Sequence, residues 1–203
     1  IDGQDGIYDV DWDSHYMDVN QIEKDKLGNI WITNQFCEEY GNLLAIQSAD
    51  DGNWSHVHIP DENSYTPQTI ALEVRGPFRR IWIGFEFGKT KDPPGNDYSS
   101  GGIKVLKYNN FTFNEADSTW IAISNPEVLP GGLEDYSIWS IVFDHMGFLW
   151  VLSEKGVQGY IVNGNDIITL EPLYPNDFLA HLSYEQGNRI KVDSQNNKWI
   201  ITH

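Results

Sequence analysis

The chain has 203 residues and a formal net charge of −17, from 30 acidic and 13 basic residues, and 13% of its residues are aromatic. The aromatic content argues against a disordered chain. The negative charge argues against nucleic acid as a partner, because no basic stripe would displace counterions from phosphates. The single cysteine, Cys37, excludes an intrachain disulfide. No apolar run reaches the roughly 18 residues of a membrane-spanning helix, so we expect no membrane insertion in this segment.

Residues 1–20 carry one pattern with a possible metal-binding meaning. Asp9, Asp11 and Asp13 alternate as at the start of a calcium-binding loop. However, Ser14 stands where such a loop has its glycine and Asn20 where it has its last acid. We interpret the three aspartates as a weak calcium candidate and expect no other cofactor. The chain starts at Ile1 without Met, and we expect it to be a fragment of a longer protein.

A repeated motif begins after Gln21. Three segments align without gaps, at 22–32, 141–151 and 190–200. In each segment an aspartate precedes a tryptophan by six positions, and a glycine or asparagine follows the aspartate by three. The motif residues are Asp25, Gly28 and Trp31; Asp144, Gly147 and Trp150; and Asp193, Asn196 and Trp199. A looser copy has Glu73 in place of the aspartate, a longer turn, and Trp82.

The residue types in the motif predict a hairpin. The aspartate carboxylate accepts hydrogen bonds from the amides of a turn, and Gly or Asn supplies the positive φ that closes it. The tryptophan in the second strand is large enough to fill the space between neighbouring sheets. We therefore interpret the aspartates as turn caps and the tryptophans as core residues, rather than as catalytic acids and sugar platforms.

Each of the first three hairpins is followed by two further strand-like runs. We expect these at 42–46 and 54–59, at 102–108 and 120–123, and at 157–162 and 166–170. Four antiparallel strands per repeat, with tryptophans spaced by 51, 68 and 49 residues, predict an all-β propeller of about three and a half blades. A β-sandwich would not repeat one signature at near-regular spacing. We place the blades at 21–69, 70–139, 140–188 and 189–203, with 1–20 as a linker or the end of a preceding blade.

Two resemblances follow from these residues. The segment Ser48–Trp54 resembles the Asp-box turn of sialidase-like propellers, which is structural in that family. The Asp, Gly and Trp pattern resembles the two-component-regulator propeller repeat over about 180 residues. That repeat occurs in bacterial sensor ectodomains and in secreted or cell-surface propellers, including type IX secretion components. The resemblance implies an extracytoplasmic recognition module in the periplasm, at the cell surface or secreted, without defined catalytic residues.

The long segments between the predicted strands are where a binding site is expected, because binding residues concentrate in loops on a rigid scaffold. These segments combine acids with tyrosines, which suits a protein or glycan ligand. The candidate ligand-binding residues are Glu38, Glu39, Tyr40, Tyr65, Asp97, Tyr98, Glu134, Asp135, Tyr136, Asp177 and Tyr184.

Three functions stay open at this point. The first is a non-catalytic recognition or sensing propeller that binds a protein or glycan and packs against the rest of its own chain. The second is a glycan hydrolase or lyase on the same scaffold, which would need two converging carboxylates, one of them with a raised pKa. The third is a purely structural segment of a large surface protein.

Overall fold

The computed structural model describes residues 18–35, 44–57, 59, 66–73, 79–86, 102–108, 118–125, 128, 137–153, 156–173 and 189–201. These residues form 14 β-strands joined by turns. No helix in the described part is long and apolar enough to cross a membrane.

The strands form three four-stranded units and one hairpin. The first blade contains β1 (Asp18–Lys24), β2 (Ile30–Gln35), β3 (Leu44–Gln47) and β4 (Trp54–Val57). The second contains β5 (Thr66–Glu73), β6 (Arg79–Glu86), β7 (Gly102–Tyr108) and β8 (Ser118–Ile123). The third contains β9 (Ile138–Phe143), β10 (Leu149–Ser153), β11 (Gly156–Asn163) and β12 (Ile167–Pro172). The hairpin is β13 (Arg189–Val192) with β14 (Lys198–Ile201).

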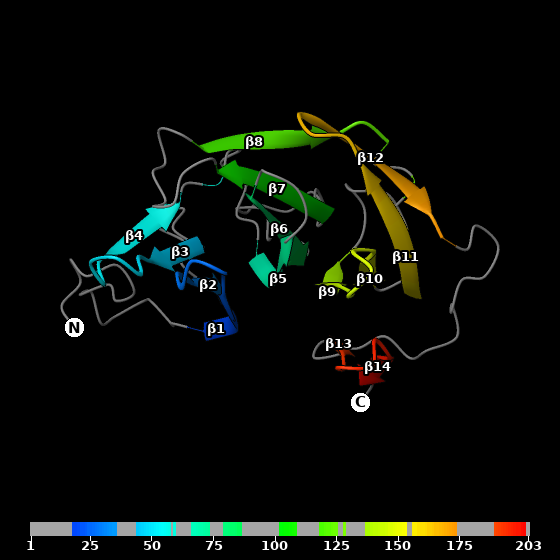
Figure 1. Ribbon diagram of the computed structural model, residues 1–203, viewed down its shortest axis with the longest axis horizontal. Helices are drawn as coiled ribbons and strands as arrows, with labels where there is room; N and C mark the ends of the chain where they lie inside the picture. The colour runs from blue at the N-terminus through cyan, green and yellow to red at the C-terminus, as the bar shows by residue number, and fades with distance from the viewer. Residues whose placement is uncertain are drawn as a thin grey trace, which may run out of the picture.

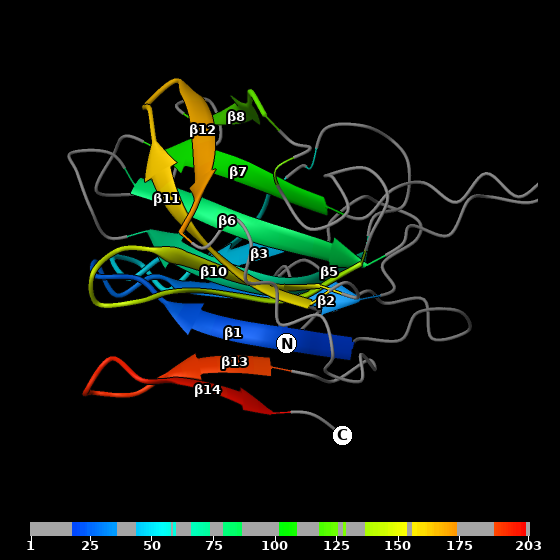
Figure 2. The same ribbon diagram turned by 90° about the vertical axis from the view of Figure 1, so that its right-hand side faces the viewer.

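Neighbouring strands within each unit pair antiparallel and in chain order, so the predicted all-β propeller of four-stranded blades is confirmed. The first strands β1, β5, β9 and β13 gather around a common axis, while β4, β8 and β12 lie outside (Figure 1). The inner strands run in the same direction, which places the tight turns after β1, β9 and β13 at one end of the molecule (Figure 2). The first three begin a few residues before the divisions expected from the sequence.

Apolar side chains pack between successive blades rather than within one. One cluster joins the first and second blades and includes Trp31 and Ile70, which are both almost completely buried. A second cluster joins the second and third blades around Trp82 and Leu149, and a smaller one links the third blade to Ile190 of β13. Strands such as β7 read as nearly continuous apolar runs because both of their faces are covered in this stack.

Hydrogen bonds between inner strands fix the register of one blade against the next. Four residues before the acid of each repeat stand Gln21, Thr69 and Ser140. The Gln21 side-chain amide pairs with both backbone groups of Ile70 on β5, at 2.8 and 3.1 Å. The hydroxyls of Thr69 and Ser140 accept the backbone N–H of residues 141 and 190, each at 3.1 Å. We call these three residues the axial latch.

The outer rim has a connection that the sequence did not predict. Strand β8 of the second blade pairs in parallel with β12 of the third, which makes one eight-stranded sheet ending at β5 and β9. The Asn125 side chain extends the pairing, because it donates to the Leu170 carbonyl at 2.6 Å and accepts the Leu170 amide at 2.9 Å. These two blades therefore enclose the shared core like a nearly closed barrel.

Candidate functional site

The conspicuous motif of the sequence forms a capped turn. In the third blade, Asp144 Oδ1 accepts the amides of Met146 and Phe148, at 2.9 and 3.0 Å. Its other oxygen accepts the indole N–H of Trp150 at 3.1 Å. Gly147 has a φ of 81°, a conformation that residues with a side chain seldom adopt. The carboxylate thus holds the turn closed and also orients the tryptophan of the next strand.

The same geometry recurs in the first and fourth repeats. Asp25 and Asp193 each accept two turn amides on Oδ1, and each accepts the indole N–H of Trp31 or Trp199 on Oδ2. This indole bond explains why the aspartate and the tryptophan are six positions apart. In the fourth repeat Asn196 takes the place of the glycine and has a φ of 68°.

The second blade reaches the same result with a longer acid. The Glu73 side chain accepts the indole N–H of Trp82 at 2.8 Å and forms an ion pair with Arg80, and both Glu73 and Arg80 are buried. Glutamate has one more methylene than aspartate, which allows it to reach the indole past a longer turn. Its charge is neutralised by Arg80 instead of being shared among turn amides.

The four tryptophans differ in burial, which departs from the prediction that all of them are core residues. Trp31 and Trp82 are 0% exposed, and Trp150 is half-buried. Trp199 is 61% exposed. The physical reason is that a repeat's tryptophan is covered by the following blade, and no described strand packs on this face of β14. The core prediction is therefore wrong for Trp199 in the described part of the chain.

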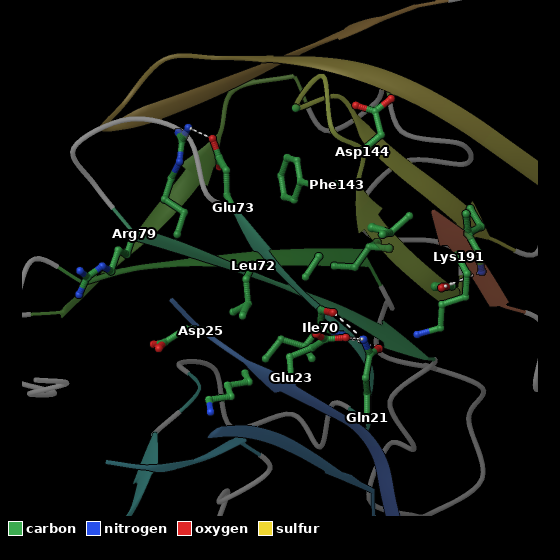
Figure 3. A pocket seen from close by; sticks show the side chains of 18 of the residues that line it. Gln21, Glu23, Asp25, Ile70, Leu72, Glu73, Arg79, Phe143, Asp144 and Lys191 are labelled. Atoms are coloured by element: carbon green, nitrogen blue, oxygen red, sulfur yellow. Dashed lines mark hydrogen bonds and ion pairs between the residues drawn. The ribbon is translucent and has the colours of Figure 1, made fainter. Parts of the chain in front are cut away.

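The described residues enclose a pocket of about 830 Å³ around the axis. It is lined by the inner strands β1, β5, β9 and β13 and by their turns, and we call it the axial pocket. Its apolar part includes Ile70, Leu72 and Phe143, and charged side chains such as Glu23 and Lys191 surround these (Figure 3). This size suits a small molecule, since ligand pockets commonly measure a few hundred to about 1,000 Å³.

Three ionisable groups that line the axial pocket, Asp144, Tyr108 and Arg189, have shifted pKa values. Burial opposes the ionisation of Asp144, but the Lys198 ammonium, the Phe148 amide and the Trp150 indole outweigh it and hold its pKa below the ordinary value. Lys198 comes from β14 and lies 2.8 Å from Asp144 Oδ2, which links two blades. Burial raises the pKa of Tyr108, and the nearby Asp25 carboxylate, which accepts its hydroxyl at 3.0 Å, raises it further.

The pocket acids are engaged in structural bonds. Asp25, Glu73 and Asp144 each bind an indole N–H, and Glu23 accepts the side-chain amide of Gln21 at 2.7 Å. Where a described aspartate has a clearly shifted pKa, the shift is downward; these residues are Asp51, Asp144 and Asp193. Low pKa values suit hydrogen-bond acceptors, whereas a general acid requires a raised one. Among the described residues, no cluster of His, Cys, Asp and Glu could hold a metal ion.

The structure does not describe the candidate ligand-binding residues chosen from the sequence. All the proposed loop acids and tyrosines, from Glu38 to Tyr184, fall outside the described residues, as do the calcium candidates Asp9, Asp11 and Asp13. The structure therefore does not test them. The sequence reasoning missed the axial pocket, because its lining residues differ from one repeat to the next. A usable signal was present: basic residues flank the repeat acids at Lys24, Lys26 and Lys191.

Comparisons with solved structures place this geometry among known propellers. The extracellular domain of BT4673 from B. thetaiotaomicron, described as a one-component system in one structure and a hybrid two-component system in another, aligns with TM-scores of 0.53 and 0.51 at 16% and 15% identity. PorZ, a surface component of the type-IX secretion system of Porphyromonas gingivalis, aligns with a TM-score of 0.52 at 15% identity. The chain shares the propeller fold of these proteins. No family model matches the sequence, and no curated protein matches it significantly.

The alignments cover most of this chain but a small part of each neighbour. They include 91%, 90% and 90% of the chain and 20%, 20% and 24% of the respective neighbours. The chain thus spans about a fifth to a quarter of their length. At this level of identity the likeness concerns the fold, so the expected resemblance to the two-component-regulator propellers is confirmed in that respect.

Proposed function

We propose that this propeller is a non-catalytic, extracytoplasmic recognition module that binds a small ligand or a glycan segment in its axial pocket. The observation that supports this most directly is the pocket itself, which opens among four inner strands while each of its acids is held in a hydrogen bond or ion pair of the fold. A scaffold whose carboxylates are tied to indoles and turn amides keeps its shape but leaves few acids for acid–base chemistry. The external location is supported by the extracellular and surface proteins with which the chain shares its fold.

The proposal is tested by ligand discovery followed by a turnover assay. We expect the labelled full chain to bind a defined subset of structures on a glycan array, and we expect each bound glycan to be recovered with unchanged mass after prolonged incubation. Shortening or modification of a bound glycan would instead support the hydrolase or lyase. Lack of binding, both on the array and to isolated native cell envelopes, would support a purely structural segment.

The location needs a separate experiment. Protease added to intact cells should degrade the protein while an internal marker enzyme survives, because an extracytoplasmic surface domain is accessible from outside. If the protein is degraded only after the cytoplasmic membrane is opened, the extracytoplasmic part of the proposal is wrong. The candidate loop residues, such as Tyr98 and Tyr184, remain a prediction for binding a larger partner.

A further inference from the structure

The axial pocket concentrates positive charge in a strongly acidic protein. Six of the chain's 13 lysines and arginines line it, together with four of its 30 acidic residues. The basic residues are Lys24, Lys26, Arg79, Arg80, Arg189 and Lys191. The acids are Glu23, Asp25, Glu73 and Asp144. An excess of cations here is opposite in sign to the charge of −17 on the whole chain.

The pocket acids do not neutralise this excess. Glu73 is paired with Arg80, and Asp144 with Lys198. Asp25 is buried and accepts hydrogen bonds from neutral groups, namely turn amides, an asparagine, an indole and a phenol, so it keeps its charge, as does Glu23. These two acids are outnumbered by the other lining cations, Lys24, Lys26, Arg79, Arg189 and Lys191, so the pocket keeps an excess of positive charge.

Three of the cations have no side-chain partner among the described residues. The side chains of Lys24, Lys26 and Lys191 are exposed and make no ion pair or hydrogen bond there, although the backbones of Lys24 and Lys191 pair within their hairpins. They come from the two inner strands at opposite ends of the described array, β1 and β13, and from the turn after β1. Like charges that share a cavity repel one another, and a bound anion relieves this repulsion.

A buried arginine gives a second, independent indication. Arg80 is only 7% exposed, and its Nε has no hydrogen-bond partner although its Nη atoms bind Glu73 and the Gly164 carbonyl. An unpaired buried donor is costly, particularly on a charged group. Arg80 lines the axial pocket and also a smaller adjoining cavity of about 290 Å³. Its side chain therefore lies between the two spaces.

The apolar part of the pocket limits the kind of anion. The partly exposed side chains of Leu72 and Phe143 form a surface beside the charged groups (Figure 3). A hydrated inorganic ion would gain nothing from this surface, whereas the apolar face of a ring or short chain would lose contact with water there.

We propose that the axial pocket binds a small organic anion with one apolar face and a carboxylate, sulfate or sulfonate group held by Lys24, Lys191 and their basic neighbours. This names the ligand class of the recognition site and rests on the proposed function. The apolar face lies against β5 and β9, and the acidic group lies toward the lysines of β1 and β13.

The test compares two probes of equal shape and different charge, 1-naphthalenesulfonate and its neutral analogue 1-naphthalenesulfonamide, by isothermal titration with the full chain. The sulfonate should bind about tenfold or more tightly than the sulfonamide, although the net charge of the protein repels it. Its affinity should fall as salt is added, because added ions screen the lysines. Equal affinities for the two probes, or binding of neither, would overturn the proposal.

Charge reversal locates the site. The double variant Lys24→Glu/Lys191→Glu should lose the preference for the sulfonate, while the milder Lys24→Gln should reduce it. The single reversals Lys24→Glu and Lys191→Glu have a control of equal charge change in Lys104→Glu on β7, which lies outside the pocket and should retain the preference. If this control weakens sulfonate binding as much as either single reversal, the preference arises from net charge and the site assignment fails. If array ligands still bind while the sulfonate does not, the anion proposal fails and the recognition function stands.

Discussion

Trp82 and Trp199 occupy equivalent positions in the repeat but have different surroundings. Trp82 is 0% exposed, and its ring centroid lies 5.7 Å from that of Phe143 in the next blade, in an edge-on arrangement. Trp199 is 61% exposed on the last described strand. The repeat thus fixes the bond from indole to acid in both places, but only a neighbouring blade turns the tryptophan into a core residue.

This difference predicts unequal effects of truncation. Trp82→Ala should lower the free energy of unfolding by about 3–5 kcal/mol, because it leaves a large cavity and removes the indole donor from Glu73. Trp199→Ala should cost less than about 1 kcal/mol, as is usual for exposed positions. Urea unfolding of both variants followed by circular dichroism measures the difference. Similar losses in the two variants would contradict the blade arrangement.

Asp144 and Lys198 give a prediction about pH. The pKa of Asp144 is lower in the folded protein than its ordinary value, so its ionised form stabilises the fold. This stabilisation is complete above the unfolded pKa of about 3.9 and is lost as the pH falls through the lower native pKa. Lys198→Met removes the cation 2.8 Å away and should raise the native pKa of Asp144. The stability that ionised Asp144 contributes is then smaller, and its loss on acidification is complete at a higher pH.

Carbon NMR of the Asp144 carboxyl during an acid titration measures this shift directly. Lys107→Met is the control, since Lys107 pairs with Asp166 on a different surface and does not contact Asp144. An Asp144 titration curve that is the same with and without Lys198 would show that turn amides alone set its pKa.

At the level of strands, the axial latch holds successive blades in register through single polar side chains. Thr69 is 0% exposed; its hydroxyl donates to Gln21 Oε1 at 2.9 Å and accepts the Ile141 amide at 3.1 Å. One hydroxyl thus connects β1, β5 and β9. In the fourth repeat, the residue four positions before the acid is Arg189. Its side chain donates a hydrogen bond to the Trp139 carbonyl at 3.2 Å, and burial lowers the pKa of its guanidinium.

Removing the Thr69 hydroxyl should therefore weaken two blade contacts together. Thr69→Val keeps a similar shape but leaves the Ile141 amide and Gln21 Oε1 without this partner, which should cost about 1–3 kcal/mol of unfolding free energy. Thr69→Ser keeps the hydroxyl and should lose less. Thermal and urea unfolding of the two variants measures the difference. If the Thr69→Val protein is as stable as the Thr69→Ser protein, the hydroxyl of the axial latch does not stabilise the fold.

The sequence predicts the local parts of this structure better than the connections between them. The same hairpin needs the same residue types in each repeat, so the pattern of Asp144, Gly147 and Trp150 recurs at fixed spacing. The turn and the propeller fold can therefore be predicted from the sequence. Gln21, Thr69 and Ser140 perform one task with different chemistry, which hides them from a search for repeats. The pocket lysines stand out only when four inner strands are brought together. The loop candidates, including Tyr40 and Asp177, remain untested predictions.

For the whole molecule, the blades do not all depend on one another to the same degree. Strands β8 and β12 join the second and third blades at the rim, whereas β5 and β9 join them near the axis. The first blade and the β13–β14 hairpin contact their neighbours mainly through one side. The chain therefore contains a central block with two edges of contact and flanking parts with fewer.

This arrangement predicts the pattern of native-state hydrogen exchange. Core amides of the second and third blades should exchange through one shared opening event, with a free energy higher than that for β13–β14. Asn125→Ala removes the side-chain pair with Leu170 and should separate the two blades into events of different free energy. Ser124→Ala, which removes only an exposed hydroxyl contact with Thr169, is the control. Independent opening in the unaltered chain would contradict the prediction.

The pairing of β8 with β12 also has a mechanical consequence. If the chain is stretched from its two ends, β13–β14 and the first blade should detach at low force, because their described strands make no rim pairing with a neighbouring blade. The central block must break its parallel rim and its axial contacts before it can extend, and it should be the last part to unfold. Under such a pulling force, β5 and β9 should therefore stay folded after the first blade and β13–β14 have unfolded. The apolar side of the axial pocket, which these two strands supply, would then remain intact.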